Sequence, residues 1–182
     1  MEFVIKRKEL LEALKSMKAV VPRSSPIKEL EGFLLDSDED AGEITLTATN
    51  MESSIQRKLA ASVGVSGSCV IDAKLLTDMA SLLGEDDVNF KMLNNGYIKI
   101  SSGNCIYTVA ALLPKNYPRP EMPFPEDTIK VTGICDLYAR TVSTVGSNPD
   151  KPALTGIHLD IFSDCMCILI FRNYNENLKK KG

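Results

Sequence analysis

The stretch EFVIKRKELLEALKSMKAVV at residues 2–21 passes from a short apolar segment directly into a charged, amphipathic one. The same pattern returns as SCVIDAKLLTDMASLLGEDD at 68–87 and, more faintly, as TIKVTGICDLYARTVSTVGS at 128–147. Each copy predicts a short β-strand followed by a helix. Self-similarity along a chain indicates a repeated structural unit, and here the strand–helix pair is the part that repeats.

Apolar residues recur at helical spacing in the first two copies, so we expect one buried stripe on each helix. The first stripe comprises Leu10, Leu14, Met17 and Val21, and the second comprises Leu75, Met79, Leu82 and Leu83. The polar positions of the two helices are expected to face a ligand or solvent. They are Lys8, Glu12, Lys15 and Lys18 in the first helix and Lys74, Thr77, Asp78 and Ser81 in the second. Asp72 stands where an N-cap would precede the second helix.

Three strand-like segments follow each helix. They lie at 32–36, 43–49 and 53–59 after the first helix and at 88–93, 97–101 and 106–112 after the second. Turn residues separate them, and Asn94-Asn95-Gly96 is typical of a β-hairpin. The sequence therefore predicts an α+β fold built from repeated β-α-β-β-β units with antiparallel sheets.

A proline-rich segment from Pro114 to Pro125 follows the second unit, and it cannot continue a helix or a central strand. We interpret it as a connection between domains. The expected organisation is one domain at 1–118, a connection at 119–127 and an incomplete second domain at 128–182, which has a divergent C-terminal tail.

The composition is that of an ordinary globular protein, with 182 residues, 44% of them hydrophobic and 25% charged. No secretory signal or membrane-spanning run is present, which favours a cytoplasmic protein. The five cysteines have no zinc-site spacing and His158 is the single histidine, so we expect no metal and no cofactor. Since the chain also lacks a phosphate-binding glycine loop and a G-x-S-x-G motif, we expect no active site.

The charge is unevenly distributed. The net charge is −3, yet residues 1–28 carry seven Lys and Arg against three Glu, a local net charge of +4. A basic segment on an acidic body favours a polyanionic partner. The alternative is a solvated helix face.

Four segments, taken together and in this order, resemble the bacterial DNA polymerase III beta subunit, the sliding clamp, in its Gram-positive versions. They are ITLTATNMESSIQRKL at 44–59, VIDAKLLTDMASLL at 70–83, YTVAALLPKNYPRP at 107–120 and NPDKPALTGIHLD at 148–160. The resemblance implies a DNA-clamp fold in which helices line the inner face of a ring and antiparallel sheets form the outside. It also implies a non-catalytic processivity factor that tethers DNA polymerase III to duplex DNA, with the polymerase and the clamp loader as partners.

The resemblance implies site residues as well. Arg23 or Ser24, of which we favour Arg23, and Lys74 match DNA-contacting positions of the first domain. Asn148 and Lys151 match positions near the DNA in the second domain. The alternative for each charged residue is ordinary surface.

Ile106, Tyr107 and Val109 match the edge strand that pairs with a neighbouring subunit in the homo-oligomeric ring, and core packing is the alternative for Tyr107 and Val109. Leu154 matches one wall of the groove that receives partner peptides.

The sequence departs from the family pattern after the LTGIHLD stretch. Residues 161–182 read IFSDCMCILIFRNYNENLKKKG, and the A-T-D-G-[HY]-R-L motif of the peptide groove is absent. We therefore expect a truncated clamp subunit in which the ordinary ring cannot close. The competing hypotheses are a clamp-derived binding or regulatory module without processivity activity, and an unrelated small-molecule enzyme on a β-α-β-β-β core.

Overall fold

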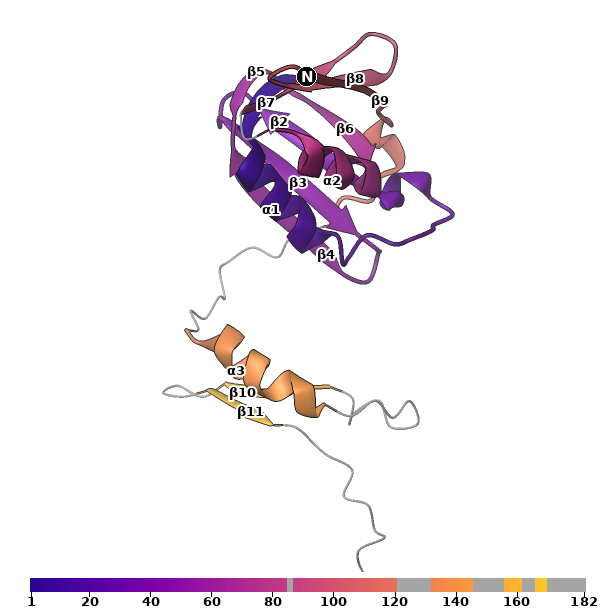
Figure 1. The fold of residues 1–182 in the computed structure, drawn as a ribbon. Helices are drawn as coiled ribbons and strands as arrows, with labels where there is room; N and C mark the ends of the chain where they lie inside the picture. The colour runs from indigo at the N-terminus through magenta and orange to yellow at the C-terminus, as the bar shows by residue number, and fades with distance from the viewer. Residues whose placement is uncertain (85–86, 121–131, 146–155, 162–165, 170–182) are drawn as a thin grey trace, which may run out of the picture. The chain divides into compact units, whose positions relative to one another are not determined.

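The computed structural model describes residues 1–84, 87–120, 132–145, 156–161 and 166–169 (Figure 1). Contacts divide the chain into two compact units, Met1–Met122 and Pro123–Gly182. Each unit is described by itself below.

The first unit contains the two complete repeats expected from the sequence. The first repeat runs β1 (Glu2–Lys6), α1 (Arg7–Met17), the 3-10 helix η1 (Lys28–Glu31), β2 (Gly32–Asp38), β3 (Glu43–Thr49) and β4 (Ser54–Ala60). The second runs β6 (Gly67–Asp72), α2 (Ala73–Leu82), β7 (Asp87–Met92), β8 (Tyr97–Ser102) and β9 (Cys105–Ala110). A short strand that the sequence did not predict, β5 (Ser62–Val65), joins the repeats.

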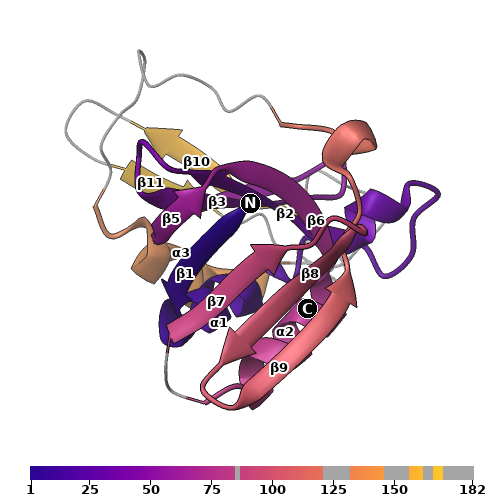
Figure 2. The ribbon, with the colours of Figure 1, turned by 90° about the horizontal axis from the view of Figure 1, so that it is seen from above.

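The two repeats exchange their first strands. One sheet has the order β5-β1-β7-β8-β9 and the other has the order β4-β3-β2-β6, and every neighbouring pair is antiparallel. Strand β1 of the first repeat thus pairs with β7 of the second, and β6 of the second repeat pairs with β2 of the first (Figure 2). Each sheet therefore needs both repeats, and neither repeat forms a sheet alone.

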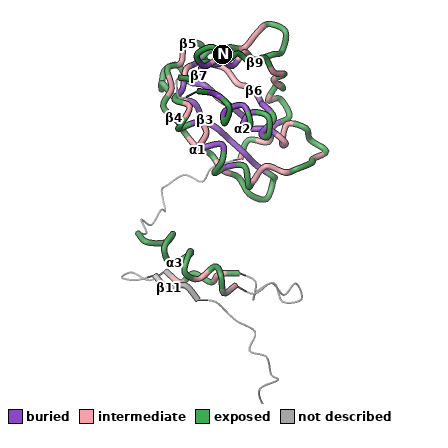
Figure 3. The backbone as a smooth tube through the Cα atoms, in the orientation of Figure 1, coloured by how far each residue is buried: buried purple, intermediate pink, exposed green. Residues whose placement is uncertain are grey.

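The two helices occupy equivalent positions in the repeats. Their first residues, Arg7 and Ala73, lie 66 positions apart, and at this offset the buried Leu10 corresponds to the buried Leu76. The other buried positions also correspond pairwise, as Ala13 with Met79, Leu14 with Ala80 and Met17 with Leu83. Both stripes face a core that also receives side chains from both sheets. The buried residues of the helices and strands are coloured purple in Figure 3.

The predicted stripe of the second helix was half right, because Met79 and Leu83 are buried as predicted but Leu75 and Leu82 are not. Leu75 and Leu82 are 42% and 72% exposed, whereas Leu76 is buried. The Asp72 carboxylate caps the helix by accepting a hydrogen bond from the Leu75 backbone N–H at 2.7 Å, as predicted, so α2 begins at Ala73. Because successive helical residues are about 100° apart, this start leaves only one member of the Leu75–Leu76 pair facing the core.

Arg7 ties the two helices together. Its Nε donates to the carbonyl oxygen of Ala80 at 3.0 Å, and its Nη2 donates to that of Ser81 at 3.1 Å. These carbonyls lie in the last turn of α2, where backbone acceptors lack intrahelical partners and a positive charge is favoured. The start of α1 therefore lies beside the end of α2, and the opposite ends of the two helices also meet.

The segment after β9 packs on the four-stranded sheet. Leu112 and Val70 exchange backbone hydrogen bonds of 2.9 Å, and the 3-10 helix η2 (Pro114–Asn116) follows. Tyr117 is buried against Leu34 and Val70, and burial raises the pKa of its hydroxyl to about 12. Arg119 forms a two-pronged ion pair with Asp36, with N–O distances of 2.9 and 3.0 Å. The first part of the predicted connection thus belongs to the first unit.

The described part of the second unit is smaller. It contains α3 (Ile134–Thr141), the 3-10 helix η4 (Val142–Thr144), β10 (His158–Ile161) and β11 (Met166–Leu169), and the two strands pair antiparallel. No helix among the described residues has the length and apolar character that crossing a membrane requires.

Candidate nucleic-acid interface

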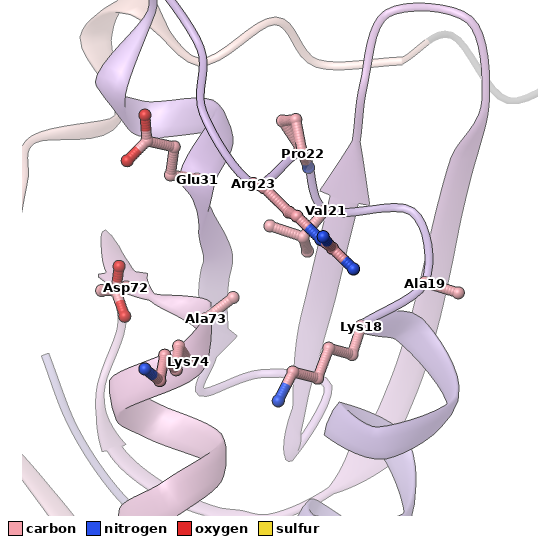
Figure 4. A pocket seen from close by; sticks show the side chains of 9 residues that line it. All are labelled: Lys18, Ala19, Val21, Pro22, Arg23, Glu31, Asp72, Ala73 and Lys74. Carbon is pink, nitrogen blue, oxygen red and sulfur yellow. The ribbon is translucent and has the colours of Figure 1, made fainter.

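A hollow of about 780 Å³ opens where the end of α1 meets the start of α2 (Figure 4). The loop that follows α1 forms one side of it and the first turn of α2 forms another. Its lining residues are Lys18, Ala19, Val21, Pro22, Arg23, Glu31, Asp72, Ala73 and Lys74. The fold therefore brings together Arg23 and Lys74, which the sequence predicted separately as DNA-contacting residues.

Three basic side chains border the hollow, because Lys18 joins Arg23 and Lys74. All three are exposed, and within the described part of the chain no ion pair with a carboxylate is found for any of them. Their positive charges are therefore available to an anion that approaches from solvent.

The two carboxylates of the hollow hold its walls in place. Asp72 caps α2, as described above, and Glu31 Oε1 accepts hydrogen bonds from the Ser25 backbone N–H at 2.9 Å and from Lys28 Nζ at 3.0 Å. The Ser25 bond, followed by the Lys28 bond, lowers the pKa of Glu31. Glu31 therefore stays ionised and holds the loop that carries Arg23.

The remaining exposed face of the two helices is of mixed charge. Lys8 and Lys74 are equivalent second residues of their helices, and Glu12 corresponds to Asp78 at the same offset. Thr77, predicted as a solvent-facing polar position, is instead buried, and its hydroxyl donates to the carbonyl oxygen of Ala73 at 2.6 Å. That bond satisfies the hydroxyl inside the core and removes Thr77 from the ligand-facing set.

Arg57 is a basic residue on the helix side that the sequence reasoning missed. Its Nη1 donates to Ser16 Oγ on α1 at 3.1 Å, so its side chain turns toward the helices. Its neighbour Lys58 points the other way and pairs with Glu43 at 2.5 Å. Strand alternation could have revealed this difference, because side chains two positions apart lie on the same face of a strand. Arg57 therefore shares a face with the partly buried Ile55 and the buried Leu59.

Ser24 is exposed next to Arg23 but is not among the residues that line the hollow. Asn148, Lys151 and Leu154 lie outside the described residues, so their predicted roles stay predictions.

The three predicted interface residues lie on β9, the last strand of the five-stranded sheet. Ile106 is 60% exposed, whereas Tyr107 and Val109 are half-buried and pack against the core. The core packing that was the alternative for Tyr107 and Val109 is present, and the interface role of the three residues stays a prediction.

A comparison with protein families assigns this architecture. The family model for the DNA polymerase III beta subunit, N-terminal domain, matches residues 1–123. The chain belongs to the DNA polymerase III beta subunit family. The α+β fold predicted from the repeats and the clamp fold implied by the resemblance are therefore both confirmed, and so is the resemblance that the four sequence segments carried.

Curated relatives extend the similarity beyond the first unit. The beta sliding clamp of Chlamydia muridarum is 27% identical over 173 residues, which cover 93% of this chain and 46% of the relative. The beta sliding clamp of Staphylococcus aureus strain Mu50 is 28% identical over 170 residues, covering 87% of this chain and 44% of the relative. The chain thus spans about half the length of the curated beta sliding clamps it matches.

Solved structures of this family share the fold. The beta subunit from the DNA polymerase of Streptococcus pyogenes superposes with a TM-score of 0.80 at 18% identity, covering 95% of this chain and 51% of that one. The DNA polymerase sliding clamp from Bacillus subtilis gives a TM-score of 0.75 at 20% identity, covering 88% and 44%. At these identities the likeness concerns the fold alone.

Proposed function

We propose that this chain acts as part of a DNA sliding clamp, a non-catalytic processivity factor that keeps DNA polymerase III on duplex DNA in the cytoplasm. In this proposal the α1–α2 side of the first unit lies along the sugar–phosphate backbone. The observation that carries the proposal is the hollow that Lys18, Arg23 and Lys74 border, in a chain of this family. Among the residues that the structure describes, none of the three forms an ion pair with a carboxylate. The polymerase and the clamp loader are its proposed protein partners.

The chemistry of this side suits a contact that does not read sequence. Lysine and arginine side chains bind phosphate oxygens, which are the same at every base pair. Each neutralised phosphate releases counterions, so the affinity depends steeply on salt. The carboxylates of Glu12 and Asp78 lie on the same helix faces, and their repulsion of phosphate keeps the contact weak enough to move along the duplex.

A second candidate is a clamp-derived binding module that does not encircle DNA. The observation that favours it is the outer edge of β9, which pairs with β8 alone among the described strands and carries the exposed Ile106, a surface suited to another strand. Retention on circular DNA separates the two candidates. A ring-forming assembly stays on closed circles and slides off linear fragments, whereas an open module leaves both at the same rate.

The test of the DNA contact is the salt dependence of duplex binding by the full chain. Arg23→Ala and Lys74→Ala should each lower the slope of log K against log salt by about 0.9, the value for one lost phosphate contact. The effect should be the same on two duplexes of unrelated sequence. Lys58→Ala is the matched control, because Lys58 points to the opposite side of the sheet from Arg57.

The proposal fails if binding by the Arg23 and Lys74 variants equals that of the unmodified chain. It also fails if Lys58→Ala weakens binding as much as they do, since the contact would then lie on the outward side of the sheet.

A further inference from the structure

The helix α1 has different neighbours on its two sides. Arg7 reaches the last turn of α2 on one side, whereas Ser16 accepts a hydrogen bond from Arg57 of β4. Arg7 and Ser16 are nine positions apart, and at about 100° per residue they project from opposite sides of the helix. Arg57 therefore lies on the side of α1 away from α2, and it is not among the residues that line the hollow.

The C-terminal end of α1 connects Arg57 with the hollow. Lys18, the C-cap residue of α1, borders the hollow, and Lys15 in the last turn is exposed. Around the helix, Ser16 lies about 100° to one side of Lys15, and Lys18 lies about 60° to the other side. A basic surface therefore runs from the hollow across the end of α1 to Arg57.

The hydroxyl of Ser16 orients the Arg57 guanidinium without neutralising its charge. The hydroxyl donates to the Ala13 carbonyl oxygen at 2.8 Å, so its oxygen accepts the hydrogen bond from Arg57 Nη1 at 3.1 Å. A guanidinium has five N–H donors, and in the described part of the chain the Ser16 bond is the one hydrogen bond of the Arg57 side chain. No ion pair among the described residues includes Arg57. Its charge and most of its donors therefore face an approaching anion without competition from a carboxylate.

We propose that Arg57 is a further phosphate-binding residue, positioned by Ser16, and that it binds a backbone phosphate other than those at the hollow. The inference rests on the proposed function, because the ligand is the same DNA duplex. A helix with its side chains is about 10–12 Å across, so groups on the two sides of α1 contact different phosphates. The guanidinium fork suits this contact, since it can donate two parallel hydrogen bonds to one phosphate.

The first test compares two adjacent basic residues that point to opposite sides of β4. In duplex binding by the full chain, Arg57→Ala should lower the slope of log K against log salt by about 0.9, and Lys58→Ala should leave it unchanged. The double variant Arg23→Ala/Arg57→Ala should lower the slope by about 1.8, because the two side chains bind separate phosphates. Arg57→Lys should keep the slope, since the charge remains, and should lower the affinity, since the fork is lost.

The second test keeps Arg57 and changes the residue that positions it. Ser16→Asp gives the guanidinium a carboxylate partner, so it should lower the slope as Arg57→Ala does. Ser16→Ala removes the acceptor but favours the helix, and it should weaken binding by roughly two- to tenfold at an unchanged slope. Ser16→Thr, which keeps the hydroxyl, should bind as the unmodified chain does. A purely structural contact between α1 and β4 would change the unfolding temperature of these variants and leave the salt slope unaltered.

Two outcomes separate this inference from the proposed function. If Arg57→Ala and Ser16→Asp leave the slope unchanged while Arg23→Ala and Lys74→Ala lower it, the inference is wrong and the DNA contact at the hollow stands. If none of these variants changes the slope, both are wrong. An equal effect of Arg57→Ala and Lys58→Ala also contradicts the inference, because the contact would then not be confined to the helix side.

Discussion

The hydroxyl of Tyr117 donates a hydrogen bond of 3.0 Å to the backbone carbonyl of Thr47, across 70 positions of sequence. This bond fixes the segment after β9 onto β3, an interior strand of the four-stranded sheet. The same segment is held by the Arg119–Asp36 ion pair. The fold of the first unit therefore extends past its last strand and depends on side chains in a proline-rich stretch.

The burial of the Tyr117 hydroxyl predicts that the stability of the chain depends on pH. Burial, followed by the influence of Asp36, raises the pKa of Tyr117 from 10.0 to about 12 and that of Cys69 from 9.0 to about 12. Both groups become anionic on deprotonation, so the folded state holds their protons more tightly than the unfolded state does. Their contribution to stability is complete below the unfolded pKa values and should be lost as the pH rises toward 12.

Urea unfolding between pH 8 and about pH 11 checks this prediction, because that window spans the ordinary pKa values of both groups. Tyr117→Phe should be less stable at pH 8, by about 1 kcal/mol for the lost hydrogen bond. Its stability should also fall less steeply above pH 10 than that of the unmodified chain. If the stabilities of Tyr117→Phe and of the unmodified chain fell equally with rising pH, the pKa of Tyr117 would be the same in the folded and unfolded states. That result would contradict the prediction.

The orientation of α2 predicts that two adjacent leucines contribute very differently to the free energy of unfolding. Leu76→Ala removes a side chain that is 1% exposed and should lower the free energy of unfolding by about 2–5 kcal/mol. Leu75→Ala alters a side chain that is 42% exposed and should change it by no more than about 0.5 kcal/mol. Denaturant unfolding of both variants measures the difference, and a larger loss for Leu75→Ala would contradict the described phase.

Asp72 allows capping and electrostatics to be separated. Asp72→Asn keeps an N-cap of similar strength, so stability should be nearly unchanged, while the hollow loses one negative charge and duplex binding should tighten. Asp72→Ala removes the cap as well and should destabilise the chain by about 1 kcal/mol. Thermal unfolding and a binding titration of both variants are sufficient, and weaker DNA binding by Asp72→Asn would contradict the proposed contact.

Local patterns predicted most of the secondary structure. Helical spacing identified both helices, and turn residues identified the strands between them, because these signals depend on neighbours in sequence. The phase of α2 could not be read from leucine spacing, since its buried stripe uses Ala73, Thr77 and Ala80 as well as Leu76 and Met79. These small side chains carry little hydrophobic signal, so the buried face of α2 becomes evident only from its packing in the core.

The exchange of strands between repeats could not be predicted from either repeat alone. The pairing of β1 with β7 depends on contacts such as the stacked rings of Phe3 and Phe90, whose centroids lie 4.6 Å apart. Arg23 and Lys74 also come together through contacts between the repeats. The Arg7 hydrogen bonds and the shared core fix how the two helices lie against each other. The resemblance named these two residues and the helical pattern named Lys18 as an outward-facing position, whereas Arg57 was recognised only from the fold.

The most direct test of the central claim is an NMR titration of the full chain with a short duplex, following the backbone amides. The account predicts that the largest shifts fall in residues 18–25 and 72–75 around the hollow. They should be the same for duplexes of different sequence and should disappear at high salt. Shifts concentrated around Lys58 on the outward side of the four-stranded sheet, or shifts that depend on the DNA sequence, would contradict it.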